Sequence, residues 1–156
     1  MSELLKVGIT HGDVNGISYE ILLKTFTDDR ILELFTPVIY GSSKSASYYR
    51  KVLDNNSVNF NIIQKAEEAQ SGRVNLVNSV KEETKIEVGT ASAESGESAY
   101  IALDAATLDL KDNKIDVLVT LPINKDSIQN EKFNFPGHTE FLEDRFSENG
   151  EKALMI

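Results

Sequence analysis

The chain contains no cysteine among its 156 residues. This absence excludes disulfide bonds, thiolate catalysis and cysteine-based zinc sites. It is compatible with a reducing cytoplasm, and we expect a cytoplasmic protein. The N-terminal sequence MSELLKVGIT has no long apolar segment typical of a signal peptide. No apolar run approaches the 18 residues that a membrane-spanning helix needs, so we expect no membrane partner.

Basic residues are outnumbered, with 16 lysines and arginines against 25 acidic residues and a net charge of -9. This balance argues against a nucleic-acid backbone or an anionic membrane as the main partner. The charges are interspersed along the chain and indicate an ordinary solvated surface.

The chain also lacks the G-x-G-x-x-G fingerprint of Rossmann-type dinucleotide sites. Short apolar runs instead alternate with helical stretches, a pattern that predicts βαβ units and a largely parallel sheet. We expect strands at 4–10, 37–40, 59–64 and 115–121, and helices at 18–26, 45–53, 92–110 and 139–146. Ser18 and Ser92 are the expected N-caps of the first and third helices.

Three further expectations concern strands. The run at 115–121 is almost continuously apolar, as expected for a strand covered on both faces. Residues 74–77 suit an edge strand or part of a hairpin, because the polar residues around them obscure any periodicity. Residues 153–156 look like the start of a further strand.

The only two histidines, His11 and His138, both lie in turns that contain glycine, within ITHGDVNG and FNFPGHTEF. Gly137 permits a sharp turn, and Thr139 can cap the next helix and leave free N–H groups beside the imidazole. This arrangement suits an anionic, hydroxylated ligand. A capped helix with a hydrogen-bonded histidine is the equal alternative. For His11, local chemistry favours a turn residue without a binding role.

Lys125 follows the apolar run at 115–121, in TLPINKDSI. Ligands of open α/β sheets gather outside the carboxyl ends of the strands. Lys125 could therefore meet a phosphate or carboxylate as a point charge. The alternative is a solvated loop lysine.

Two segments resemble one enzyme family. ITHGDVNGI resembles the N-terminal ITPGDPAGIGPE signature of the 4-hydroxythreonine-4-phosphate dehydrogenase family. LPINKDSIQNEKFNFPGHTEFLEDRF resembles that family's GPINK…G…FPGHTEFLA segment, and the order and spacing of the motifs match along the whole chain. The first motif is looser, because His11 stands where the family has proline, so we assign His11 no family role.

The resemblance implies a three-layer α/β/α fold of the isocitrate and isopropylmalate dehydrogenase type, with two domains. Residues 1–121 would belong to the first domain, and 122–156 would begin the second. It also implies a homodimer whose site borrows residues from the partner.

The implied reaction is oxidation and decarboxylation of 4-phosphohydroxy-L-threonine to 3-amino-2-oxopropyl phosphate, in pyridoxal phosphate biosynthesis. NAD (or NADP) and a divalent metal such as Zn, Mg or Co would be required. His138 and Thr139 match the substrate-binding pair, and Lys125 lies in a matching loop with a weaker substrate or phosphate role.

The chain departs from the family in length. Family members are about twice as long, and their metal-binding histidines lie beyond the position that matches Ile156. With two histidines, this chain supplies no three-histidine metal set. We therefore expect an N-terminal fragment that holds no metal and is inactive alone. Two alternatives stay open: a non-catalytic module that binds a phosphorylated metabolite or a partner chain, and a related dehydrogenase for another phosphorylated hydroxy acid.

Overall fold

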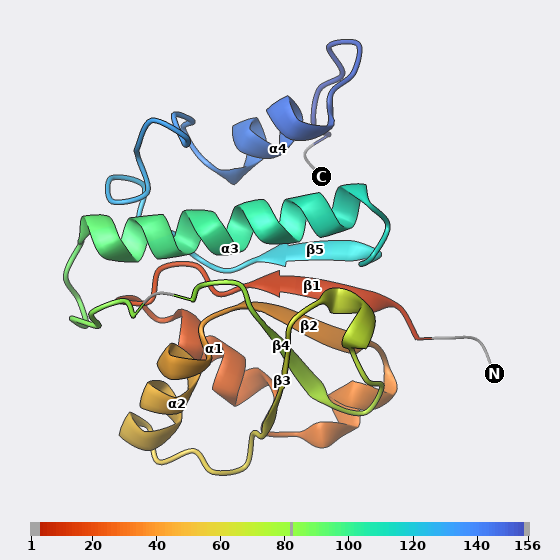
Figure 1. Cartoon of the computed structure of the whole chain (residues 1–156), viewed down its shortest axis with the longest axis vertical. Helices are drawn as coiled ribbons and strands as arrows, with labels where there is room; N and C mark the ends of the chain where they lie inside the picture. The colour runs from red at the N-terminus through yellow and green to blue at the C-terminus, as the bar shows by residue number, and fades with distance from the viewer. Residues whose placement is uncertain (1–3, 82, 155–156) are drawn as a thin grey trace.

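A computed structural model describes residues 4–81 and 83–154 of the chain. Its five strands form one parallel sheet in the order β3-β4-β2-β1-β5 (Figure 1). The strands are β1 (Lys6–Thr10), β2 (Thr36–Gly41), β3 (Phe60–Ile63), β4 (Val74–Asn78) and β5 (Val117–Thr120). The helices are α1 (Ser18–Thr25), α2 (Ser43–Val52), α3 (Ala93–Lys111) and α4 (His138–Phe146), with short 3-10 helices η1 (Asp29–Glu33) and η2 (Ala66–Glu68). The predicted parallel sheet is confirmed.

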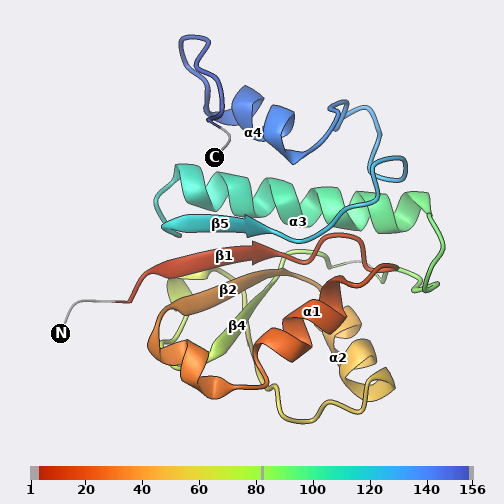
Figure 2. The ribbon, with the colours of Figure 1, turned by 180° about the vertical axis from the view of Figure 1, so that it is seen from behind.

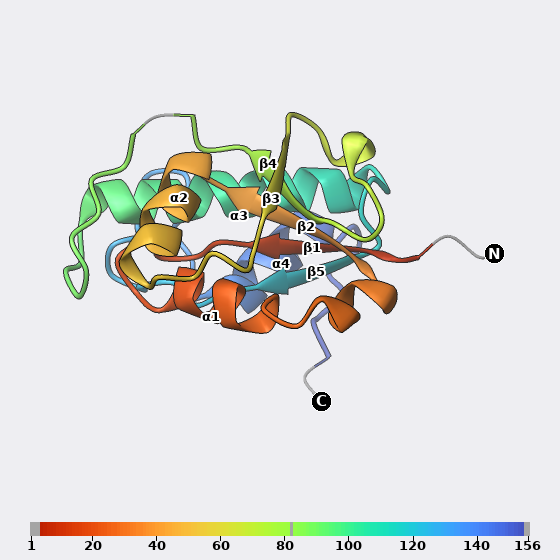
Figure 3. The same cartoon turned by 90° about the horizontal axis from the view of Figure 1, so that it is seen from below.

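Helices cover both faces of this sheet. α1 and α2 lie on one face, and α3 lies on the other (Figures 1 and 3). Successive residues of β2 point to opposite faces, so Ile39 joins a core cluster with Leu22 of α1, whereas Val38 joins a second cluster with Ala102 of α3. The fold is therefore the three-layer α/β/α arrangement that we predicted.

Helix α3 is buried on two sides. Ser92 caps it as predicted, accepting a hydrogen bond from the backbone N–H of Ser95 at 3.1 Å. One side of α3 faces the sheet. The other side places Tyr100 in a third core cluster with Phe133 and Phe141, so the segment after β5 lies across α3 (Figure 2). Within residues 4–81 and 83–154, no helix is both long and apolar enough to cross a membrane.

β4 corrects one prediction, because it is an interior strand and not an edge strand or part of a hairpin. It pairs in parallel with β2 on one side and β3 on the other. The apolar pattern was hidden by Asn75, which is fully buried. Its amide donates to the carbonyl oxygens of Pro37 and Gln70, and its side-chain oxygen accepts from Asn61 and Gln70. A buried amide with satisfied hydrogen bonds replaces an apolar side chain here.

β5 corrects a second prediction, because it is covered on one face only. In the described part of the chain it pairs with β1 alone, and α3 covers one of its faces. Val117 and Val119 are each 43 % exposed, whereas Leu118 between them contacts the core. An apolar run shows that a strand can be buried, but it does not show which elements cover it. Residues 153–154 form no strand, and 155–156 lie outside the described residues.

The start of α1 corrects a third prediction. Ser18 is the first residue of the helix and not its cap, and the capping position is Ile17, which makes no side-chain cap bond. The Ser18 hydroxyl donates instead to the carbonyl oxygen of Pro122 at 3.3 Å. The serine therefore links α1 to the loop after β5.

Candidate functional site

The loops that leave β1 and β5 are joined at the carboxyl edge of the sheet. The backbone N–H of Asp13 donates to the carbonyl oxygen of Pro122 at 2.9 Å. Gly12 has a φ of +62°, and a Cβ at this position would lie 2.3 Å from the same oxygen. Glycine is therefore required here by both conformation and space. The contact fixes where the Lys125 loop begins.

The structure brings Lys125 beside the turn that begins α4. A Cβ added to Gly137 would lie 3.9 Å from Cε of Lys125 and 3.6 Å from Oε2 of Glu140. Lys125 is exposed, whereas His138 and Thr139 are half-buried. The three residues predicted as substrate contacts therefore lie in one place.

The surroundings of His138 favour its neutral form. Burial lowers the pKa of its imidazole below the ordinary value of 6.5, and the positive charge of Lys125 lowers it further. Nε2 forms no hydrogen bond with any group of residues 4–81 and 83–154, and it is shielded from solvent. A buried polar nitrogen without a partner is unfavourable by about 1–3 kcal/mol. A ligand that reached Nε2 would relieve this cost, and the atoms that cover the nitrogen would have to move to admit it.

Thr139 does not cap α4, contrary to our prediction. The helix begins at His138, and the capping position is Gly137, which has no side chain to accept a hydrogen bond. The N–H groups of the first turn therefore receive no side-chain cap from this position, and Thr139 lies within that turn. A helix N-terminus of this kind favours anionic groups, and here it lies beside Lys125.

His11 is a core residue. It is fully buried, and its Nδ1 lies 2.9 Å from the hydroxyl oxygen of Tyr19 on α1. Its Nε2 lies 3.2 Å from both the hydroxyl and the carbonyl oxygen of Ser98 on α3. Burial lowers its pKa to about 4, so the ring is neutral at pH 7. His11 thus links β1 to helices on both faces of the sheet, which is more than the turn residue that we expected.

Asn15, in the same loop, fixes a distant segment. Its amide donates to the carbonyl oxygen of Thr90 at 2.9 Å, and its side-chain oxygen accepts from the backbone of Glu87 at 2.8 Å. Its own backbone N–H donates to Asp13. These contacts hold the loop that leads into α3, which is a structural role.

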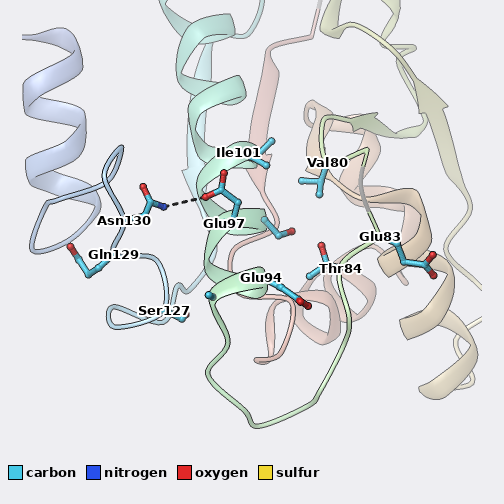
Figure 4. Close-up of a pocket in the computed structure, with 11 residues that line it drawn as sticks. Val80, Glu83, Thr84, Glu94, Glu97, Ile101, Ser127, Gln129 and Asn130 are labelled. Carbon is cyan, nitrogen blue, oxygen red and sulfur yellow. Dashed lines mark hydrogen bonds between the residues drawn. The ribbon is translucent and has the colours of Figure 1, made fainter.

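A cavity of about 370 Å³ lies at the same edge of the sheet, between the first turns of α3 and two loops (Figure 4). Its lining includes Glu83, Glu94 and Glu97, and the amide of Asn130 donates to Glu97 at 3.3 Å. The carboxylate of Glu83 points away from the cavity and pairs with Lys44 at 3.2 Å. His138, Thr139 and Lys125 do not line it. The carboxylates of Glu94 and Glu97 make this lining unfavourable for a phosphate. Sequence reasoning missed it, because its residues come from three separate segments, 80–84, 93–101 and 127–130, which only the fold brings together.

Comparison with known proteins decides the family. The family model described as "Pyridoxal phosphate biosynthetic protein PdxA" matches residues 33–156. The chain belongs to the PdxA family. It is 49% identical over 152 residues to a 4-hydroxythreonine-4-phosphate dehydrogenase of Bacteroides thetaiotaomicron, covering 97% of this chain and 41% of that protein. It is 31% identical to a D-threonate 4-phosphate dehydrogenase of Cupriavidus necator, covering 91% and 43%.

Solved structures agree with this PdxA assignment. A 4-hydroxythreonine-4-phosphate dehydrogenase from Burkholderia phymatum superposes with a TM-score of 0.83 at 25% identity, over 92% of this chain and 44% of that one. A protein described as a putative enzyme of the same name, from Salmonella typhimurium, gives a TM-score of 0.80 at 26% identity. The predicted dehydrogenase-like fold is confirmed. The chain spans less than half the length of the PdxA relatives that it matches.

The described residues of this PdxA chain do not by themselves fit a divalent metal. In the described ranges, no group of three or more histidine, cysteine, aspartate or glutamate side chains is arranged to hold an ion. We therefore assign no step of the reaction to a metal bound by these residues.

The buried His11 predicts how stability depends on pH. Its folded-state pKa of about 4 lies below the ordinary 6.5, so between these values the unfolded chain binds a proton that the folded chain does not. The free energy of unfolding should therefore fall as pH falls through this window, by about 3 kcal/mol from His11. His138, whose pKa is also lowered, acts in the same direction.

Urea unfolding between pH 7 and pH 4 measures this dependence. His11→Gln, compared with the parent chain over the same range, should have a clearly flatter profile although it is less stable at pH 7. Equal slopes for the two proteins would show that His11 is not the buried neutral group described above.

Proposed function

We propose that this chain is the substrate-holding part of an NAD-dependent 4-hydroxythreonine-4-phosphate dehydrogenase, with His138, Thr139 and Lys125 as substrate contacts. The observation that carries the proposal is the position of Lys125 beside Gly137 and the unpartnered Nε2 of His138. The matching relative from Bacteroides thetaiotaomicron bears this enzyme name.

The three side chains suit a phosphorylated hydroxy acid. Lys125 offers a positive charge to phosphate or carboxylate. A neutral His138 can accept a hydrogen bond from a substrate hydroxyl or donate one, and the hydroxyl of Thr139 can do both. These residues would bind and orient the substrate. NAD or NADP would accept the hydride, and the divalent metal (Zn, Mg or Co) would be held by residues of the whole enzyme beyond those described.

Three further features belong to the same proposal. The enzyme would work as a cytoplasmic homodimer. Residues 122–156 would begin a second domain. We propose no nucleic-acid partner and no membrane partner.

Two substrates compete for this site. One is 4-phosphohydroxy-L-threonine, from which oxidation and decarboxylation would give 3-amino-2-oxopropyl phosphate in pyridoxal phosphate biosynthesis. The other is D-threonate 4-phosphate, which the name of the Cupriavidus necator relative gives as that protein's substrate. The higher identity to the threonine-type relative favours the first.

We expect the 156-residue chain alone to form no NADH from either substrate, because it spans less than half of its relatives. Joined to the remaining part of the Bacteroides thetaiotaomicron relative, it should oxidise 4-phosphohydroxy-L-threonine in preference to D-threonate 4-phosphate. NADH absorbance with each substrate measures both outcomes, and the relative itself is the positive control. Metal-dependent NADH formation by the short chain would contradict its predicted inactivity.

In the same chimera, His138→Ala and Thr139→Val should each raise KM about tenfold or more, because each removes a hydrogen bond to a charged or hydroxylated ligand. Lys125→Met should raise KM less, by up to about fivefold, because its charge is exposed. Lys132→Met is the matched control, since Lys132 is an exposed lysine nearby in the sequence. Unchanged KM in the His138 and Thr139 variants would exclude these contacts.

The main alternative is a non-catalytic module that binds a phosphorylated metabolite or a partner chain. A folded but inactive chimera, together with binding of 4-phosphohydroxy-L-threonine to the short chain by calorimetry, would favour it.

A further inference from the structure

One ion pair joins α4 to α3. Nη2 of Arg145, near the end of α4, lies 2.7 Å from Oδ1 of Asp104, in the middle of α3. The two side chains are 32 % and 28 % exposed, so both partners are partly shielded, whereas Lys152 in its pair with Glu143 is 84 % exposed. Shielding from water strengthens such a contact relative to an exposed pair.

The same guanidinium lies over an aromatic ring. The Arg145 guanidinium carbon is 5.0 Å from the centroid of Phe141, close enough for a cation–π contact. Phe141 is fully buried, stacks on Phe133 at 5.3 Å, and meets the edge of Tyr100 on α3 at 6.4 Å. Arg145 therefore bridges the acid on α3 and the aromatic cluster beneath α4.

A further contact lies at the end of α4. The ammonium of Lys111, the last residue of α3, donates to the carbonyl oxygen of Arg145 at 3.4 Å. A cation at a helix C-terminus is favourable. The polar contacts of α4 with α3 are thus at its C-terminal end, two turns away from His138.

The geometry of α4 connects this end to the candidate site. Phe141 and Arg145 follow His138 by three and seven residues, so the three side chains share one face of the helix. The helix has nine residues and no side-chain N-cap. A helix this short is marginal in water by itself, so its contacts with α3 must hold it. These contacts fix the position of Arg145. Because both residues belong to one short helix, the contacts also fix the position of His138.

We propose that Asp104 and Arg145 are positioning residues, which dock α4 on α3 and thereby set the place of His138 and Thr139 beside Lys125. The functional meaning of this proposal rests on the substrate role proposed above for His138 and Thr139. The docking of α4 on α3 does not depend on that substrate role.

The two histidines make the proposal measurable in the 156-residue chain. NMR titration of the imidazole resonances gives two curves, and His11 reports on the core. We expect His138 to titrate below 6.5 in the parent chain, because of burial and of Lys125. In Asp104→Asn and in Arg145→Gln, a loosened α4 should expose the ring and separate it from Lys125. The pKa of His138 should then rise toward 6.5 in both variants, while His11 stays near 4.

The direction of the two shifts separates positioning from direct electrostatics. Removing the negative charge of Asp104 would by itself lower the pKa of His138, and removing the positive charge of Arg145 would raise it. Shifts of opposite sign, or no shift, would therefore overturn the proposal. Lys152→Gln removes the exposed pair with Glu143 on the same helix and should leave His138 unchanged.

If a single substitution unfolds the protein, the pKa of His11 will also move toward 6.5. A double variant in which the two charges are exchanged covers this case. Asp104→Arg combined with Arg145→Asp should restore the low pKa of His138 if the ion pair docks the helix. An unrestored value in a folded swap variant would overturn the proposal. Since no substrate is present, this result is independent of the KM measurements on His138 and Thr139.

Discussion

Replacing Gly96 with alanine should destabilise the protein, although alanine is the better helix former. Gly96 lies inside α3, where Gly→Ala ordinarily stabilises by up to about 1 kcal/mol. Here a Cβ would lie 1.7 Å from the carbonyl oxygen of Ser127 and 2.8 Å from the backbone nitrogen of Ile128. Backbone cannot rotate away as a side chain can, so the loop after β5 must shift. We expect a net loss of roughly 1–3 kcal/mol in the free energy of unfolding.

Urea unfolding measures this change, and Gly137→Ala is the matched control. A Cβ at Gly137 meets nothing closer than 3.6 Å, and its φ of −176° is open to any residue. At an N-cap alanine is less favourable than glycine, so we expect a small loss of at most about 1 kcal/mol and no displacement of the backbone. A Gly96→Ala protein as stable as the parent chain would mean that the 122–130 segment does not lie against α3 as described.

Phe133→Ala should release the segment that carries α4 from the rest of the molecule. Phe133 is fully buried in the third core cluster, in ring contact with Tyr100, Phe135 and Phe141. Truncation of a buried phenylalanine costs about 3–5 kcal/mol. This cluster is separate from the two clusters that cover the sheet. The loss should therefore fall on α4, while the sheet stays folded.

Hydrogen exchange resolves the two regions. Amides of α4 should exchange much faster in Phe133→Ala, and amides of β1 and β2 should keep their protection. Phe135→Ala is the control, because Phe135 has the same side chain two residues away but is only half-buried. Equal effects of the two substitutions would show that burial of Phe133 is not what holds α4.

Local chemistry was enough to predict most elements. The parallel sheet and α3 with its Ser92 cap follow from apolar runs and one capping serine, because these signals depend on near neighbours. The interior position of β4 was missed because Asn75 obtains hydrogen bonds from Pro37 and Asn61, which are distant in the sequence. The exposed face of β5 could not be predicted, since coverage depends on other elements.

For the candidate site, too, local signals could be read from the sequence and tertiary contacts could not. His138, Thr139 and Lys125 were proposed from local chemistry and from the family motif, and the structure places Lys125 beside the turn that carries the other two; their role as substrate contacts stays a prediction. The lack of a cap at Thr139 and the contact between Asp104 and Arg145 could not be predicted. Both depend on how α4 docks on α3, which tertiary packing decides.

The place of β1 in the sheet has a consequence for how the protein is made. β1 lies between β2 and β5, and the bond from Lys6 to Asp116 joins residues 110 positions apart. Ribosomes add about 5–20 residues per second, so β5 emerges roughly 4–15 s after the end of β2. During that time one hydrogen-bonding edge of β1 has no strand beside it, and such an edge can pair with another nascent chain. Slower translation between Gly41 and Val117 should therefore lengthen the time for which the growing chain depends on chaperones.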